Sequence, residues 1–205
     1  MNIKTLPVGQ LETNCYIVIN EETLECVVID PGDESNTILD YLETNRLICR
    51  AVMLTHGHYD HVGAVNEVME QSGCTLMYIN PRDEGYEIGM SGMKFKMPAG
   101  GKYYDDGDII KIAGLTFGVL ATPGHTPGSV TLICGSALFT GDTLFRGSCG
   151  RTDFPGGSMR AEMQSLKRIC ELPGDFEVYP GHMDSTTLER ERRFNHYCRE
   201  AVAKF

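Results

Sequence analysis

The sequence lacks tryptophan, Cys-x-x-Cys pairs and any apolar stretch near the roughly 20 residues that span a bilayer. Its first residues also lack the apolar core of a secretory signal. Eight cysteines are present, but a chain of 205 residues that is 41% hydrophobic can bury a core without disulfide bonds. We therefore expect a protein of the reducing cytoplasm that has no membrane partner.

Basic residues are also scarce. The chain has 18 Lys and Arg against 28 Asp and Glu, which gives a net charge of -10 and a pI near 5.0. Binding to nucleic acid depends on clustered Lys and Arg, so we expect a small-molecule partner instead. The length fits one ordinary domain, and we predict a single domain over residues 1–205, of unspecified oligomeric state.

Short apolar, β-rich runs bounded by turn residues predict most of the strands. They cover residues 15–19, 26–29, 51–54, 75–79, 109–112, 115–120, 130–134, 137–140 and 176–179. Helical spacing of apolar residues predicts helices over residues 35–45, with Ser35 as the cap, from residue 62 to a stop at Gly73, and over 159–170.

The end of the chain predicts one more helix, capped by Thr186 or Thr187, whose charged residues 189–193 form a solvated face. Residues 82–107, rich in Gly, Met and charge, predict a long surface excursion of the kind that borders a site. Because helices are interspersed among many strands, we predict an α/β fold of two mixed sheets with helices on the outer faces.

The motif Thr55-His56-Gly57-His58-Tyr59-Asp60-His61 follows one predicted strand and precedes a helix. Alternate side chains of an extended loop point the same way, so His56 and His58 can bind one metal ion. Asp60 and His61 enter the helical turn, where successive side chains diverge by about 100°. They can therefore face a second ion.

Three further residues follow strand-like runs and lie beside a glycine that frees the backbone to turn. They are His125 in Thr-Pro-Gly-His-Thr-Pro-Gly, Asp142 in Phe-Thr-Gly-Asp-Thr and His182 in Tyr-Pro-Gly-His. One histidine alone is more often a core or surface residue than a ligand, but this set accounts for five of the six histidines. The joint pattern predicts a two-metal site, and His196, which has no partner motif, stays outside it.

These motifs resemble the metallo-β-lactamase superfamily over essentially the whole chain, and within it the glyoxalase II-like (hydroxyacylglutathione hydrolase-like) branch. The resemblance implies an αββα sandwich with the site at one edge. It also implies that metal 1 is held by His56, His58 and His125, that metal 2 is held by Asp60, His61 and His182, and that Asp142 bridges them. Since zinc β-lactamases typically carry Cys where Asp142 stands, β-lactam hydrolysis is not expected.

Two divalent ions a few Å apart lower the pKa of a shared water towards ~7, so hydrolysis needs no Ser or Cys nucleophile. A thiolate leaves without much acid help, which makes thioesters, such as S-lactoylglutathione or related hydroxyacyl thioesters, the expected substrates of the metal-bridging hydroxide. The candidate catalytic residues are Asp60, Asp142 and Arg151. Imidazole and carboxylate ligands suit Zn, Fe and Mn; we expect Zn, with Fe or Mn as alternatives.

Three nearby residues have more than one interpretation. Asp30 either accepts a hydrogen bond from a ligand imidazole or forms an Asx turn before Pro-Gly. Arg151 resembles a glutathione-binding Lys of glyoxalase II and either holds a substrate carboxylate or is a surface residue. Cys149 is either a redox residue or a structural one, and the structural role is favoured, since no lowered pKa is indicated.

The chain also departs from glyoxalase II. It ends before the C-terminal helical domain of that family, and Asp153 and Asp184 stand where two tyrosines contact glutathione. The alternative function is that of the sister persulfide dioxygenases, which use one iron held by the equivalents of His56, His125 and Asp142. A non-catalytic metal-binding or RNA-processing role is disfavoured by the complete ligand set and the acidic charge.

Overall fold

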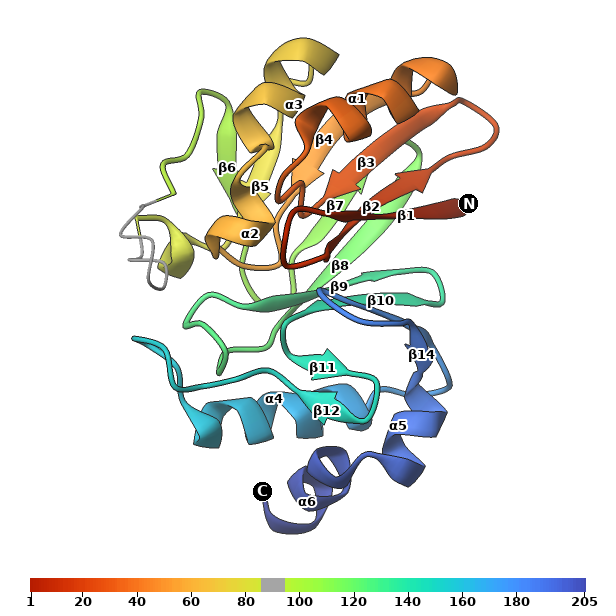
Figure 1. The fold of residues 1–205 in the computed structure, drawn as a ribbon. Coiled ribbons are helices and arrows are strands. Elements are labelled where there is room, and N and C mark those ends of the chain that lie inside the picture. Colours follow the sequence, from red (N-terminus) through yellow and green to blue (C-terminus); the bar gives the residue numbers. More distant parts are fainter. Residues whose placement is uncertain (86–94) are drawn as a thin grey trace.

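The computed structural model describes residues 1–85 and 95–205 and contains two six-stranded sheets stacked face to face (Figure 1). In the first sheet, the order follows the sequence: β1 (Asn2–Val8), β2 (Thr13–Ile19), β3 (Glu25–Ile29), β4 (Ile48–Met53), β5 (Met77–Ile79) and β6 (Gly101–Tyr103). Strands β1 to β3 pair antiparallel and β3 to β6 pair parallel. This sheet is therefore mixed.

The second sheet is also mixed. Its order is β14 (Thr186–Thr187), β13 (Glu177–Pro180), β10 (Ala137–Gly141), β9 (Val130–Cys134), β8 (Leu115–Ala121) and β7 (Ile109–Ile112). Only β10 and β13 pair parallel within it. A short hairpin of β11 (Leu144–Phe145) and β12 (Ser148–Cys149) follows the second sheet's β10.

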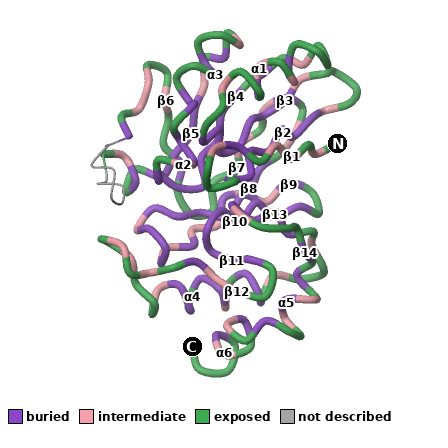
Figure 2. The backbone as a smooth tube through the Cα atoms, viewed as in Figure 1, coloured by how far each residue is buried: buried purple, intermediate pink, exposed green. Residues whose placement is uncertain are grey.

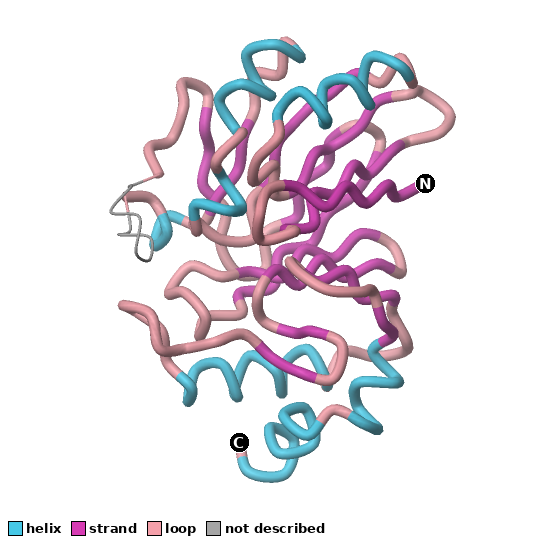
Figure 3. The backbone as a smooth tube through the Cα atoms, in the orientation of Figure 1, coloured by secondary structure: helices cyan, strands magenta, loops and turns pink. Residues whose placement is uncertain are grey.

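Helices cover the outer faces of both sheets (Figure 3). The first sheet carries α1 (Ser35–Thr44) and α3 (Val65–Ser72), and the second carries α4 (Met159–Cys170) and α5 (Leu188–Phe194), with α6 (His196–Lys204) packed against α4 and α5. The single turn α2 (Tyr59–Val62) and the 3₁₀ turn η1 (Pro81–Asp83) lie in connections. The predicted αββα sandwich is thereby confirmed. No helix in the described part of the chain is long and apolar enough to cross a bilayer.

The core consists of three apolar layers that follow from strand alternation. Cys15 and Ile17 of β2 point to the layer under α1 and α3, whereas Tyr16 and Val18 point to the layer between the sheets. A third layer lies between the second sheet and α4 to α6. β2 is buried at every position (Figure 2), and because it is buried on both faces it is apolar from Cys15 to Ile19.

Most predicted elements are present within one to three residues of the expected bounds, and α4 matches its prediction fully. The sequence did not predict β1, a half-exposed edge strand, or the three-residue β6. β6 lies inside the segment 82–107 that was predicted to be a surface excursion, so that prediction was too broad. Residues 86–94 of this segment lie outside the described part. The cap prediction was also wrong, because Ser35 is the first helical residue and Glu34 precedes it in a left-handed conformation.

The single C-terminal helix was predicted wrongly as well. Asn195 separates α5 from α6, and its side chain accepts a hydrogen bond from the Tyr197 amide as the cap of α6. Thr187 does cap α5, as predicted. The charged run is not a uniformly solvated face, because Glu191 is fully buried and accepts hydrogen bonds from Thr186 Oγ1 and the Gly147 amide.

Candidate metal centre

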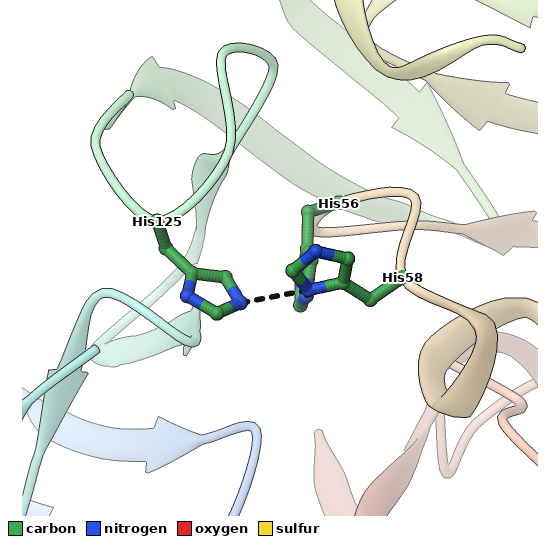
Figure 4. Close-up of side chains that lie close together, drawn as sticks. All are labelled: His56, His58 and His125. Atoms are coloured by element: carbon green, nitrogen blue, oxygen red, sulfur yellow. Dashed lines mark hydrogen bonds between the residues drawn. The ribbon is translucent and has the colours of Figure 1, made fainter. Parts of the chain in front are cut away.

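Three imidazole rings converge from two loops (Figure 4). His56 and His58 lie in the loop after β4, and His125 lies in the loop after β8. Nδ1 of His58 is 3.1 Å from Nε2 of His56 and 2.8 Å from Nε2 of His125. Three nitrogens bound to one zinc at about 2.05 Å would lie about 3.3 Å apart in a tetrahedron, so the spacing is close to that of a metal site.

A second group lies beside the first and contains Asp60, His61 and His182. Asp60 and His61 occupy consecutive positions of α2, and His182 follows β13. Oδ2 of Asp60 is 3.2 Å from Nε2 of His182 and 3.6 Å from Nε2 of His61. The helical turn therefore directs Asp60 towards His182, whereas the His61 ring also lies 4.0 Å from the His56 ring of the first group, measured between centroids.

Asp142 lies between the two groups. Its Oδ1 is 3.4 Å from Nε2 of His61, whereas its Oδ2 is 3.4 Å from Nε2 of His125 and 3.5 Å from Nε2 of His182. The preceding Gly141 has a positive φ of 48°, which turns the chain at the end of β10. Gly181 is needed for a different reason: a Cβ there would overlap the Asp142 carboxylate.

Hydrogen bonds at Nδ1 fix four of the five rings. The bonds are 2.7 to 3.1 Å long. They join His56 to Thr55 Oγ1, His61 to Asp30 Oδ2, His125 to the Arg151 carbonyl, and His182 to the Leu11 carbonyl. A proton held on Nδ1 leaves the Nε2 lone pair free to bind a cation. His58 differs, since its Nδ1 faces the cluster.

Asp30 helps to orient the rings of His56 and His61 through hydrogen bonds. Its carboxylate accepts hydrogen bonds from the Thr55 amide at 2.7 Å, from the Thr55 hydroxyl at 2.6 Å and from His61 Nδ1 at 3.0 Å. Of the two interpretations of Asp30, the structure thus favours the one in which it orients a ligand imidazole. The Thr55 hydroxyl has one proton, which goes to Asp30, so it accepts from His56.

The unpaired atoms of the cluster indicate what it holds. Within the described residues, the buried atoms without a hydrogen-bond partner include His61 Nε2 and Asp142 Oδ1, which face each other. Leaving such groups unpaired is costly. A divalent cation ligated by both would satisfy them, so the donor set fits the ions that imidazole and carboxylate bind.

The protonation of the two groups differs. Burial and the neighbouring His125 lower the pKa of His58 to about 4, and burial also lowers the pKa of His56. Burial alone would lower the pKa of His182, but Asp142 and Asp60 outweigh it and raise that pKa to about 9. Burial would also lower the pKa of His61, but Asp142 and Asp30 outweigh it and raise that pKa. Without metal, His56 and His58 are therefore neutral, whereas His61 and His182 hold protons between carboxylates.

Several supporting residues escaped the sequence analysis. Thr13 Oγ1 donates to Asp60 Oδ2 at 3.0 Å, and Asn14 donates to the Pro180 and Met183 carbonyls on either side of His182. Buried Asp83 bonds to both loops of the first group. Asp83 follows the end of β5 by four residues, so a strand-end carboxylate was the available signal.

The remaining predicted residues lie at the periphery. Arg151 is exposed; its guanidinium forms two 2.7 Å bonds to Asp153 and lies 4.0 Å from the Phe154 ring centroid. Burial raises the pKa of the half-buried Cys149 to about 12, which fits a structural thiol. His196 is 82% exposed and pairs with Glu200, away from the centre.

Comparison with known proteins is consistent with this geometry. Residues 8–182 match the family described as the metallo-beta-lactamase superfamily. The chain is 33% identical to the hydroxyacylglutathione hydrolase GloC of Haemophilus influenzae, over 95% of this chain and 97% of that one.

Among solved structures, the B3 metallo-beta-lactamase BLEG-1 matches with a TM-score of 0.88 at 31% identity, covering 96% of this chain and 99% of that one. TTHA1623, solved in a di-iron-bound form, matches with a TM-score of 0.83 at 38% identity, over 95% and 99%. ETHE1 from Myxococcus xanthus matches with a TM-score of 0.84 at 29% identity, over 100% and 86%.

Proposed function

The chain belongs to the metallo-beta-lactamase superfamily, and from this premise we propose that it hydrolyses thioesters with two divalent metal ions. The observation that carries the proposal is the pair of adjacent ligand groups with Asp142 between them. The proposed ligands are His56, His58 and His125 for metal 1 and Asp60, His61 and His182 for metal 2. Relatives of this chain include a hydroxyacylglutathione hydrolase.

Bound divalent ions would supply an acidified water as the nucleophile and a Lewis acid for the scissile carbonyl. The chain's own residues hold the reacting groups in place. The Asp60 carboxylate, which is partly exposed to solvent, accepts a hydrogen bond from the Thr13 hydroxyl at 3.0 Å. This bond fixes its orientation. His182 and Asp60 retain 21% and 15% side-chain exposure, whereas His61 is fully buried. Substrate therefore has access at the second group.

We also propose that recognition does not depend on glutathione. Asp153 and Asp184 replace the family's glutathione-contacting tyrosines, and each carboxylate is paired with an arginine, Arg151 or Arg146. Arg151 remains a candidate anchor for a substrate carboxylate, because its carbonyl bonds to His125 and keeps it beside the centre. To bind substrate in this way, its guanidinium must leave Asp153.

A metal count combined with a thioester panel tests the proposal. Protein loaded with Zn, Mn or Fe is expected to bind two ions and to hydrolyse thioesters without oxygen, with S-lactoylglutathione favoured no more than about tenfold in kcat/KM, roughly 1.4 kcal/mol, over thioesters lacking the tripeptide. Metal-stripped protein is the control. Two bound ions without hydrolysis of any thioester, ester or lactone would overturn the proposed activity.

One observation favours a second candidate, an iron-dependent persulfide dioxygenase. His56, His125 and Asp142, the residues expected to hold one iron, lie close together, with His125 Nε2 3.4 Å from Asp142 Oδ2, and TTHA1623, solved in a di-iron-bound form, is a relative that binds iron. The two functions differ in their reactants. One bound iron and oxygen consumption with a persulfide would select the dioxygenase, whereas two ions and anaerobic hydrolysis select the hydrolase.

A further inference from the structure

Asp83 joins the two loops that carry the first histidine group. One carboxylate oxygen accepts from the Gly57 amide at 2.8 Å and from the Thr126 hydroxyl at 2.7 Å, and the other accepts from the Gly128 amide at 2.6 Å. Gly57 lies between His56 and His58, and Thr126 follows His125 directly. A single side chain thus bonds to both loops next to their histidines.

The glycines in these loops are explained by the same carboxylate. A Cβ on Gly57 would lie 2.7 Å from the Asp83 carbonyl oxygen, and a Cβ on Gly128 would overlap the Asp83 carboxylate. Both loops can therefore approach Asp83 only because glycine stands at these positions. The contact is close-packed on both sides, which restricts how far the loops can move apart.

The bonding pattern requires a carboxylate and not merely a polar side chain. Three donors converge on Asp83, which is fully buried at the end of η1. A carboxylate offers two acceptor oxygens, whereas an amide of the same shape offers one oxygen and adds two donors. An Asn in this place would leave at least one loop amide facing another donor, and such a buried unpaired group is costly.

We propose that Asp83 is the positioning residue of metal 1, because it holds the His56–His58 loop and the His125 loop at the separation that lets three imidazoles share one ion. The hydrogen bonds of the Asp83 carboxylate go to two loop amides and to the Thr126 hydroxyl, so it acts through the loops that carry the rings. Metal 2 is supported separately, by Thr13 on Asp60 and by Asp30 on His61. Loss of Asp83 therefore weakens one position selectively. The proposal rests on the proposed two-ion centre.

Asp83→Asn tests this inference through two measurements that need no substrate. In metal-free protein, hydrogen exchange at the Gly57 and Gly128 amides is expected to accelerate at least tenfold. Under competition with a chelator, metal 1 is expected to bind about 10- to 100-fold more weakly, as when other supporting contacts of metal ligands are lost. Adding His182→Ala should then remove the remaining ion, whereas adding His58→Ala should change little.

Leu166→Ala is the matched control, because Leu166 of α4 is fully buried in the third apolar layer and its truncation destabilises the fold without removing a hydrogen bond to either loop. It should keep both ions and the slow exchange of both amides. If Asp83→Asn does not fold, Thr126→Val removes one donor only and should give the same selective loss at smaller amplitude. Two retained ions with unchanged exchange in Asp83→Asn would overturn the inference, whereas a wild-type chain that binds no metal would overturn the proposed function.

Discussion

Asp142 faces both histidine groups. Asp142→Ala is therefore expected to lower the metal content at both proposed positions and to reduce activity at least about 100-fold, as for other groups that position reactants. His196→Ala changes an exposed ring and should leave metal content and activity as they are. Elemental analysis after dialysis measures the first effect, and full metal content in Asp142→Ala would remove the argument for a bridged pair.

Glu162 is a buried acidic residue of α4. It lies in the first turn of α4, fully buried, with its carboxyl oriented towards the His125 and Gly150 amides but without a hydrogen bond of good geometry. Burial raises the pKa of this carboxyl to about 9. At neutral pH, the folded protein therefore keeps Glu162 protonated.

A raised acid pKa has a defined effect on stability. The folded state binds a proton that the unfolded state releases near pH 4.5, so stability is fully present below that pH and is lost as pH rises towards about 9. Glu162→Gln removes this proton, and the metal-free variant is expected to lose less stability than wild type between pH 5 and pH 9. Urea unfolding midpoints of both proteins at pH 5 and pH 9 measure this difference. Parallel changes with pH would contradict the raised pKa of Glu162. His61 and His182 titrate in both proteins, so their contributions cancel in the comparison.

At the scale of elements, the break between α5 and α6 depends on one fully buried residue. Asn195 caps α6 through the Tyr197 amide and donates to the Ser148 carbonyl at 2.9 Å and to Glu191 Oε2 at 3.0 Å. Asn195→Ala loses the cap and leaves buried acceptors unpaired, which should cost about 1–3 kcal/mol of unfolding free energy. Denaturant unfolding measures this, with exposed Asn45→Ala expected within about 0.5 kcal/mol of wild type. Equal losses in the two variants would contradict it.

The elements also show what the sequence could and could not predict. Buried runs such as those of β2 and β9 have patterns that need no partner to be recognised, and the His-x-His-x-Asp-His motif specifies its own geometry at a strand end. β1 carries Pro7 and alternates exposed with half-buried residues, so its identity depends on pairing with β2.

Long-range contacts account for the supporting residues that were missed. Asp83 meets partners 26 to 45 positions away, and Glu191 meets Gly147 across 44 positions. From the sequence alone, a charged residue in a helix is predicted to be exposed to solvent. Its burial can be recognised only when the segment that packs against it is known. The His-x-His-x-Asp-His ligands could be recognised from a short stretch of sequence. The residues that orient them come close to them only in the folded chain.

At the scale of the whole molecule, the proposed ligands come from both halves of the sandwich. His56, His58, Asp60 and His61 follow β4 of the first sheet, and His125, Asp142 and His182 follow strands of the second. Bound ions would therefore join the two sheets. Metal that binds only the folded state stabilises it, by about 2.7 kcal/mol at a free concentration 100 times the dissociation constant.

That stabilisation is expected to grow with pH. In the metal-free protein, Asp142 and Asp60 outweigh burial and raise the pKa of His182 to about 9, and His61 shifts the same way. The stability from these protonated rings is present below pH 6.5 and is lost as pH rises through about 9. Metal needs the neutral rings, so raising the pH removes a competitor for the ion while the metal-free protein weakens.

The gap in melting temperature between metal-loaded and metal-free protein should therefore widen from pH 6.5 to pH 9 at constant free metal. His58 adds little to this slope, because its ring, with a pKa of about 4, is already neutral throughout that range. His182→Ala supplies the control, since it removes a ligand of the second group and leaves the first. Its gap should be smaller and should widen less with pH, because only His61 of the second group's rings still titrates. A constant gap in wild type, or an equally steep one in His182→Ala, would mean that protons held by the second group do not compete with the metal.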